Sequence, residues 1–140
     1  WLKKIEIHLA ITGVAAVSGP FDYGFSGLKK ILAKIYTRQI MSKISKLLML
    51  IFRREAGVIM GGNFAVRRAT MERIKKLPQV AFWGDDSAIA MVISRQVGQV
   101  FFNPDLIVKS SSRRFERSGL IKTVLHYALA HFKAYFNYNY

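Results

Sequence analysis

Two long segments of the chain carry apolar residues at intervals of three and four, and this spacing constrains the fold more than any other feature. In the first segment the apolar positions are 28, 31, 32, 35, 40, 41, 44, 47, 48, 51 and 52, and in the second they are 120, 121, 124, 125, 128, 129, 132 and 136. Such spacing gathers the apolar side chains on one face of an α-helix. The sequence therefore predicts amphipathic helices over 28–52, with one break, and over 120–136.

The shorter segments around these helices suggest strands and further helices. Apolar and polar residues alternate in KIEIHLAI, and short apolar runs bounded by glycine or proline occur further on, so extended structure is predicted for 3–17, 57–66 and 99–108. Helices are predicted for 68–77 and 85–96, and loops for 18–27 and 110–119. This alternation favours a mixed α/β layer over a helix bundle.

The chain is strongly basic, with 22 Lys and Arg against 8 Asp and Glu and a formal net charge of +14. Such a charge indicates an anionic partner: nucleic acid, an anionic lipid surface or a phosphorylated substrate. No uninterrupted apolar run reaches the roughly 18 residues of a membrane span. Cysteine is absent, and His8, His126 and His131 do not have the spacing of metal ligands, so the residues predict no zinc site.

Two of the eight acidic residues are adjacent, in the stretch FWGDDSAIA at 82–90. An aspartate at the start of a helix accepts hydrogen bonds from free backbone amides and suits the helix dipole. One carboxylate is enough for that role, so either Asp85 or Asp86 is free for another. The two interpretations are a cap with a solvated neighbour, and a general base or metal ligand held at the start of the helix.

Two further stretches combine positive charge with groups that contact ligands. GGNFAVRR at 61–68 has a glycine pair that lets a ligand approach the backbone, and two arginines at the start of a helix, where we expect an anion or a carboxylate to hold one of them. SSSRRFER at 110–117 has three hydroxyls and three arginines, a set suited to phosphate. A tight turn with solvated arginines and a solvated basic loop are the alternative interpretations.

In this order and spacing, GGNFAVRR, then WGDDSAIA and then VGQVFFNPDLIVKSSSRRF resemble the C-terminal half of a family-2 glycosyltransferase. The family pattern is Gly-Gly-Asn-x-Ala-x-Arg-Arg, then Gly-Glu-Asp before an apolar helix, a Gly-x-Val strand, a turn with proline and an arginine-rich segment. AAVSGPF at 15–21 resembles the segment that follows the family's nucleotide-binding half. The resemblance covers most of 11–118 and implies an α/β fold, part of a GT-A (Rossmann-like) mixed sheet with flanking helices and a C-terminal amphipathic helix.

The resemblance also implies an activity, the inverting transfer of a sugar from a nucleotide-diphosphate sugar to an acceptor hydroxyl. Asp86 matches the general base of the family. Asp85 stands where glutamate is usual, which implies a supporting role for it. Gly61, Gly62 and Asn63 match the loop that lines the pocket for the acceptor and the donor sugar.

Three more residues belong to the expected site. Trp83 precedes the aspartate pair, and we expect it to line the same pocket and to shield the Asp86 carboxylate from water. Arg113 and Arg114 resemble part of the Gln-x-x-Arg-Trp element of processive members, although serine stands in place of Gln and phenylalanine in place of Trp. Binding of the nucleotide diphosphate is implied for these two arginines, whereas processive polymer synthesis is not supported.

The family binds its nucleotide and a divalent metal, Mg²⁺ or Mn²⁺, through an Asp-x-Asp motif in an upstream half. No Asp-x-Asp occurs in these 140 residues. We therefore expect the chain to be the acceptor-side part of a truncated enzyme, inactive alone and without a metal site of its own. Residues 1–118 are expected to belong to the GT-A domain, and 119–140 to form the amphipathic helix and an aromatic tail.

Lysines, arginines and aromatic residues flank the apolar faces of both long helices. Packing on a sheet is one interpretation, and attachment to an anionic membrane surface is the other. The resemblance favours attachment, at the cytoplasmic face and peripheral, because many members act on lipid-linked or cell-envelope glycans. The alternative functions are a basic nucleic-acid-binding domain and a membrane-surface module without catalysis. No nucleic-acid motif is present and the aromatic residues are spread through apolar segments, so nucleic acid is not the expected partner.

Overall fold

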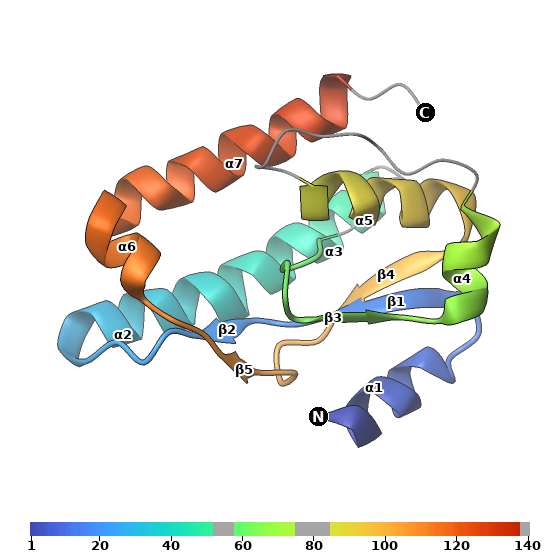
Figure 1. Ribbon diagram of the computed structural model, residues 1–140, viewed down its shortest axis with the longest axis horizontal. Coiled ribbons are helices and arrows are strands. Elements are labelled where there is room, and N and C mark those ends of the chain that lie inside the picture. The colour runs from blue at the N-terminus through green and yellow to red at the C-terminus, as the bar shows by residue number, and fades with distance from the viewer. Residues whose placement is uncertain (52–57, 75–84, 138–140) are drawn as a thin grey trace.

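The computed structural model describes residues 1–51, 58–74 and 85–137 and shows a mixed α/β fold with a small sheet (Figure 1). In chain order the elements are α1 (Leu2–Leu9), β1 (Val14–Ser18), β2 (Phe21–Asp22), α2 (Gly27–Lys34), the π-helix η1 (Ile35–Ile40), α3 (Met41–Ile51), β3 (Phe64–Val66), α4 (Arg68–Arg73), α5 (Asp85–Gln96), β4 (Gln99–Phe102), β5 (Val108–Lys109), α6 (Arg113–Ser118) and α7 (Leu120–Asn137). The mixed α/β class predicted from the sequence is confirmed.

The sheet is built around β1, which pairs in parallel with β4 and antiparallel with β3. A second parallel pair joins β2 to β5. Because β2 follows β1 and β5 follows β4 in the chain, the second pair continues from the carboxyl ends of the first (Figure 1). The extended structure predicted for 99–108 is therefore present as two strands, and each pairs with an earlier strand and not with the other.

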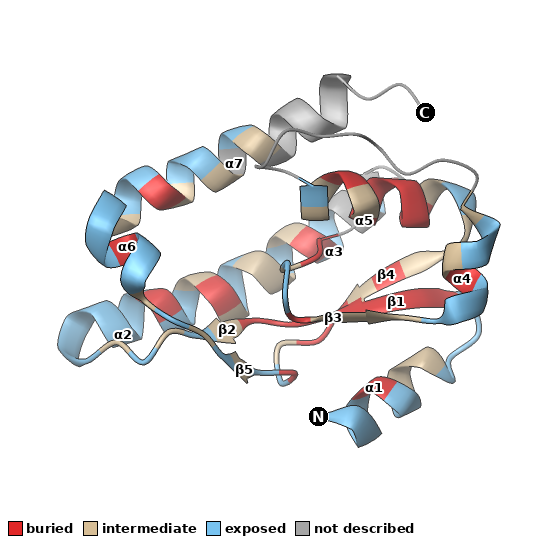
Figure 2. Ribbon diagram, viewed as in Figure 1, coloured by how far each residue is buried: buried red, intermediate tan, exposed pale blue. Residues whose placement is uncertain are grey.

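Helices cover both faces of this sheet. Helix α1 packs on one side, where Ile5, Val14, Val17 and Leu106 form a buried cluster. Helix α5 lies on the other side, with α7 packed over it (Figures 1 and 2). Since α5 has the sheet below and α7 above, it is buried nearly all round, and five of its residues have no exposed surface: Ala88, Ala90, Met91, Val92 and Ile93.

The first segment corrects a prediction, because the alternating stretch KIEIHLAI belongs to α1 and is not a strand. Ile5 and Leu9, one helical turn apart, both pack on the core. Ile7, which a strand would turn to the same side as Ile5, is 57% exposed. A segment this short fits a period of two and a period near four equally well, and packing on β1 selected the helix. Extended structure begins only at Val14.

The basic stretch at 110–119 also differs from the predicted loop, since it contains α6. Phe115 is buried, and its ring lies 4.5 Å from the ring of Tyr23 and 5.8 Å from that of Phe25, both edge-on. Burial of this aromatic side chain fixes the segment, and the charged side chains of the helix remain in solvent. The sequence missed α6 because six residues are too short for a periodic signal.

The two long helices are confirmed, but the break predicted in the first is absent, and a π-helical segment, η1, lies in the middle of a continuous helix. Helices α2, η1 and α3 run without interruption, and Met41 N–H bonds the carbonyl of Tyr36, five residues back. The helix predicted over 68–77 is shorter, because Ile74 adopts an extended conformation after α4. No helix in the described ranges has both the length and the apolarity to cross a membrane.

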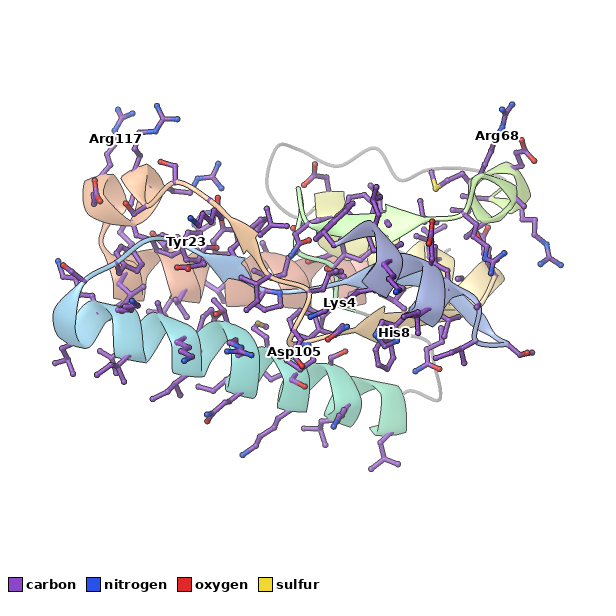
Figure 3. The ribbon with its side chains drawn as sticks, turned by 90° about the horizontal axis from the view of Figure 1, so that it is seen from below. Lys4, His8, Tyr23, Arg68, Asp105 and Arg117 are labelled. Atoms are coloured by element: carbon purple, nitrogen blue, oxygen red, sulfur yellow. The ribbon has the colours of Figure 1, made fainter. Side chains whose placement is uncertain are left out.

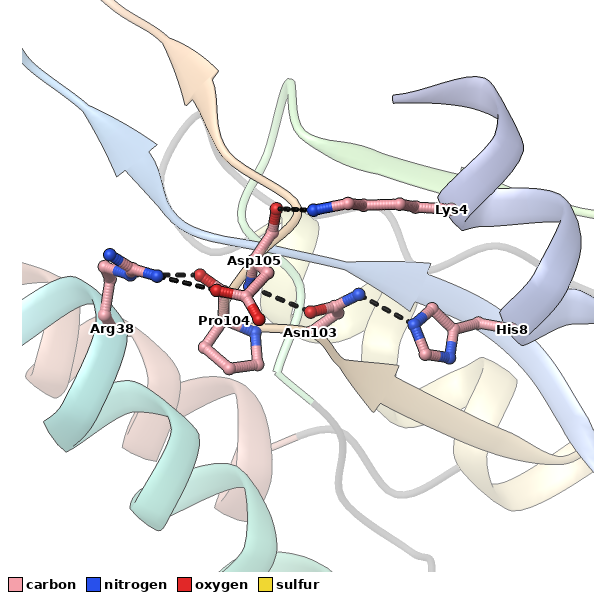
Figure 4. A network of polar contacts seen from close by, with 6 residues as sticks. All are labelled: Lys4, His8, Arg38, Asn103, Pro104 and Asp105. Atoms are coloured by element: carbon pink, nitrogen blue, oxygen red, sulfur yellow. Dashed lines mark hydrogen bonds and ion pairs between the residues drawn. The ribbon is translucent and has the colours of Figure 1, made fainter.

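The turn between β4 and β5 joins three parts of the chain (Figure 4). Arg38 of η1 forms an ion pair with Asp105, with Nη2 2.6 Å from Oδ1. Lys4 of α1 donates to the Asp105 carbonyl at 3.0 Å, and Nδ2 of Asn103 lies 2.7 Å from Nε2 of His8. An amide nitrogen donates, so Nε2 of His8 is the acceptor in this contact. The turn thus fixes α1 and the long helix on either side of the parallel strands.

Candidate functional site

The sequence motifs meet where β1 and β4 end. The loop at 60–63 lies beside the residues that follow β1, because Gly19 N–H and the Ser18 hydroxyl both bond the carbonyl of Asn63. Helix α5 begins next to this loop (Figure 1). The carboxyl ends of parallel strands, together with helix N-termini that point toward them, are where α/β sheets bind ligands.

Both aspartates lie in the first turn of α5, which begins at Asp85. The prediction that one of them is the N-cap, the residue before the first helical residue, is therefore wrong, because both lie within the helix. Residue 84, which precedes the helix, lies outside the described residues. Negative charge in the first turn is favourable because the amide dipoles there point outward. Asp85 is exposed, and Asp86 is half-buried with both carboxylate oxygens in hydrogen bonds.

Asp86 and Gly61, 25 residues apart, are in direct contact. Gly61 N–H donates to Oδ2 of Asp86 at 3.1 Å, and Ser87 N–H donates to Oδ1 at 2.8 Å. A Cβ atom at position 61 would lie 3.1 Å from the same Oδ2, so a larger residue there would require the carboxylate to shift. The structure therefore brings together two of the motifs that the sequence analysis singled out.

A tight turn shapes the loop. Asn63 N–H bonds the carbonyl of Met60 at 2.8 Å, and Gly62 has a φ of 87°, which favours glycine. The predicted Gly-Gly turn is confirmed. Gly61 and Gly62 are both exposed, so the outer side of the loop remains open to a ligand.

Asn63 has a structural function that the sequence did not predict. Its side chain is fully buried, and Nδ2 donates to the carbonyl of Pro20 at 2.9 Å and to that of Leu106 at 2.7 Å. Oδ1 accepts from Nε1 of Trp1 at 3.1 Å. Both amide hydrogens are therefore used within the chain. The residue positions the loop against the ends of both parallel strands.

The arginines that open α4 are held by different partners. Nε of Arg68 lies 2.9 Å from Oε1 of Glu72, one turn further along, as expected for a carboxylate partner. Arg67 donates to the carbonyl of Leu9 and so ties α4 to the end of α1. Both arginines are exposed, and an i,i+4 pair at the surface contributes about 0.3–0.5 kcal/mol.

Arg113 and Arg114 lie on α6, which Figure 1 places at the left end of the molecule, away from the start of α5. Nε of Arg113 donates to the hydroxyl of Ser111 at 3.0 Å, and Nη1 of Arg114 donates to the hydroxyl of Tyr127 at 2.6 Å. In the described part of the chain the two arginines therefore do not contact Asp86. Trp83, the remaining expected site residue, lies outside the described residues.

A cleft of about 210 Å³ opens between β2 and the long helix, and sequence reasoning missed it. Its walls include the aromatic residues Phe21, Tyr23 and Phe25 on one side and Lys30 and Lys34 on the other. Burial raises the pKa of Tyr23 well above its usual range, with further contributions from the neighbouring Tyr127 and Tyr36. The glycine and proline residues at 18–27 indicated a turn, and nothing in that stretch indicated that its aromatic residues would line a cleft.

No group of three or more metal-binding side chains occurs among the described residues. Among these residues, Asp85 and Asp86 therefore have no third metal-binding side chain beside them. No protein-family model, no curated protein and no solved structure matches the chain.

Proposed function

We propose that the chain is the acceptor-side part of a family-2 glycosyltransferase with a GT-A fold, acting by inverting transfer. One observation carries the proposal: the Gly61 amide bonds the Asp86 carboxylate at 3.1 Å, at the carboxyl ends of β1 and β4. The family resemblance requires this loop and this aspartate to share one site, although 25 residues separate them. A chance similarity of short motifs would not require their contact.

In the proposed reaction Asp86 is the general base. Its carboxylate takes the proton of the acceptor hydroxyl while that oxygen forms a bond to the anomeric carbon of the donor sugar. The bond from the anomeric carbon to the diphosphate breaks, and the nucleoside diphosphate leaves with the electron pair. The hydrogen bonds from Gly61 and Ser87 hold the carboxylate in one orientation. The supporting role proposed for Asp85 is to keep the approach to Asp86 negatively charged.

The loop and the neighbouring residues are proposed to bind the two substrates. Gly61 and Gly62 supply exposed backbone for the sugar, Asn63 fixes their position from below, and Trp83 lines the pocket. Arg113 and Arg114 are proposed to bind the diphosphate through their guanidinium groups. Because the two arginines lie apart from Asp86 in this structure, this role requires α6 to move toward Asp86 when the nucleotide binds.

The divalent metal of the family does not fit the residues described here, because they contain no cluster of three or more metal-binding side chains. No step of the proposal is assigned to a metal for that reason. The acceptor is proposed to be a lipid-linked or cell-envelope glycan, and the protein to act at the cytoplasmic face of a membrane.

The test is the release of nucleoside diphosphate from a panel of nucleotide sugars, measured on the intact protein encoded by the complete reading frame. Asp86→Asn should lower kcat by about 10²–10⁴-fold, the usual contribution of a general base, with KM for the donor little changed. Asp85→Asn is the matched control, since it removes the same charge from the same helical turn, and should cost about tenfold or less. Equal losses in the two variants, or an unchanged kcat in Asp86→Asn, would rule out the assignment.

A further inference from the structure

The long helix α2–η1–α3 turns small residues inward and exposes several of its large apolar residues, whereas Tyr36, Met41 and Ile44 are half-buried. Ala33, Thr37 and Ser45 are buried, at 9%, 2% and 4% exposure. Among the described side chains of the helix, seven large apolar ones are 39% to 79% exposed (Figure 2). We call six of them the outer stripe: Leu28, Ile31, Ile35, Ile40, Leu47 and Leu50.

The π-helix keeps these residues in line. Spacings of three, four or seven residues keep side chains on one face of an α-helix, and these spacings hold from Leu28 to Ile35 and from Ile40 to Leu50. The spacing from Ile35 to Ile40 is five, which would move Ile40 to another face of an α-helix. Hydrogen bonds in η1 join residues five apart, so one turn accommodates the extra residue. The stripe therefore continues along a helix of 25 residues, about 37 Å in length.

Contacts on the inner side prevent the helix from turning its stripe inward. Arg38 donates from Nε to the carbonyl of Pro104 at 3.2 Å and pairs with Asp105 at 2.6 Å. Thr37 is buried, and its hydroxyl bonds the carbonyl of Ala33 at 2.9 Å. Figure 3 shows the side chains on the opposite flank of the helix pointing away from the rest of the molecule. Exposure of the stripe is thus a fixed property of the fold.

The charges that the helix itself places beside the stripe are all positive, and Asp105 of the neighbouring turn, which lines a hollow with Ile31 and Ile35, is paired with Arg38. The helix carries five exposed lysines, Lys29, Lys30, Lys34, Lys43 and Lys46, of which Lys30 and Lys34 also line the cleft beside β2. No acidic residue occurs between Asp22 and Glu55. Long lysine side chains reach outward from the border of an apolar surface and place their ammonium groups at the level of lipid headgroups. A second copy of this face would bring like charges together, whereas an anionic lipid surface complements both the apolar line and the cations.

We propose that α2–η1–α3 lies in the plane of an anionic phospholipid bilayer, with the outer stripe in the acyl-chain boundary and the lysines at the phosphate groups. Each lysine close to the surface contributes roughly a five-fold gain in binding, and the apolar stripe adds a contribution that does not depend on salt. The proposal does not depend on the chemistry of Asp86 and survives if the chain has no catalytic activity.

The experiment is co-sedimentation of the full chain with vesicles of phosphatidylcholine plus phosphatidylglycerol, compared with phosphatidylcholine alone, at low and high salt. The test variant is Ile31→Glu with Ile35→Glu. The control is Ile121→Glu with Leu125→Glu on α7, which replaces two aliphatic residues that are more exposed than the test pair and changes the net charge equally. Circular dichroism and Tm establish that both variants are folded.

We expect the wild-type chain to bind the anionic vesicles, the test variant to lose about 100-fold or more in binding, and the control to lose about five-fold or less. Binding to neutral vesicles should be much weaker. Equal losses in both variants, equal binding to both lipids, or no binding at low salt would overturn the proposal. Sedimentation velocity tests whether a second copy of the chain covers the stripe instead. A wild-type dimer that the test variant converts to monomer, without vesicle binding, would make the stripe a contact between copies and would also overturn the membrane proposal.

Discussion

Replacing Asn63 with alanine should destabilise the fold strongly, although the residue belongs to a loop. The side chain supplies the hydrogen bonds that hold the loop against the ends of both parallel strands. In Asn63→Ala the carbonyl of Leu106 loses its donor in a buried position, which costs about 1–3 kcal/mol. The carbonyl of Pro20 keeps a bond from Val108 N–H at 3.3 Å, so its loss is smaller, about 0.5–1.5 kcal/mol.

The indole of Trp1 contributes little to this sum. It is 50% exposed, and water can replace the bond from its Nε1 to the asparagine oxygen. We therefore expect the free energy of unfolding to fall by about 2–4 kcal/mol in Asn63→Ala. Urea unfolding followed by far-UV circular dichroism measures it, with a linear extrapolation to water.

Two variants make the measurement specific. Trp1→Phe removes only the donor to Oδ1 and should cost about 0.5 kcal/mol or less. Asn63→Asp keeps the shape but directs an acceptor at the two carbonyls, so at neutral pH it should be at least as destabilising as alanine. If Asn63→Ala and Trp1→Phe gave the same free energy of unfolding, the central role of this amide in the fold would be refuted.

Two other predictions follow from close packing and from titration. Gly19→Ala should lower the free energy of unfolding by about 1–3 kcal/mol, because a Cβ there would lie 2.2 Å from the backbone oxygen of Leu106. Gly61→Ala is its control, since the nearest atom is a side-chain oxygen of Asp86 at 3.1 Å, and it should cost much less in urea unfolding. Similar losses in the two variants would contradict this account of the packing. The pKa of Tyr23 and that of Tyr36 are both raised, chiefly by burial, so each ring binds its proton more tightly in the folded state. Their contribution to stability is complete below the unfolded pKa of about 10 and is lost as the pH rises above it, at up to about 1.4 kcal/mol per pH unit for each tyrosine. Tyr23→Phe should therefore reduce the alkaline slope of Tm against pH, and an unchanged slope would refute the burial of this hydroxyl.

Local pattern was enough for much of the fold. The long helices at 27–51 and 120–137 and the apolar helix α5 followed from periodicity and from glycine and aspartate at their ends. The turn before Asn63 followed from its glycine pair, and Gly62 has the positive φ that such a turn requires. These features depend on residues close together in the chain, so one sequence contains the information that specifies them.

Contacts between distant residues decided the rest. Ile5 belongs to a helix because it packs on Val17 and Leu106, and an eight-residue segment has no period that could show this. The sequence marked Asn63 as a candidate ligand-binding residue, but its amide bonds the carbonyls of Pro20 and Leu106, both 43 residues away.

The long helix shows the division most clearly. Its sequence by itself determined that an amphipathic helix with an apolar face and many lysines would form. The periodicity predicts one apolar face but does not determine whether that face turns toward the sheet or toward solvent. The tertiary structure decided this, since Arg38 pairs with Asp105 and the small side chains of Ala33 and Thr37 fit against the body of the protein. The physical reason is that helical periodicity comes from the local backbone, whereas the direction of a face depends on the surfaces that the rest of the chain provides.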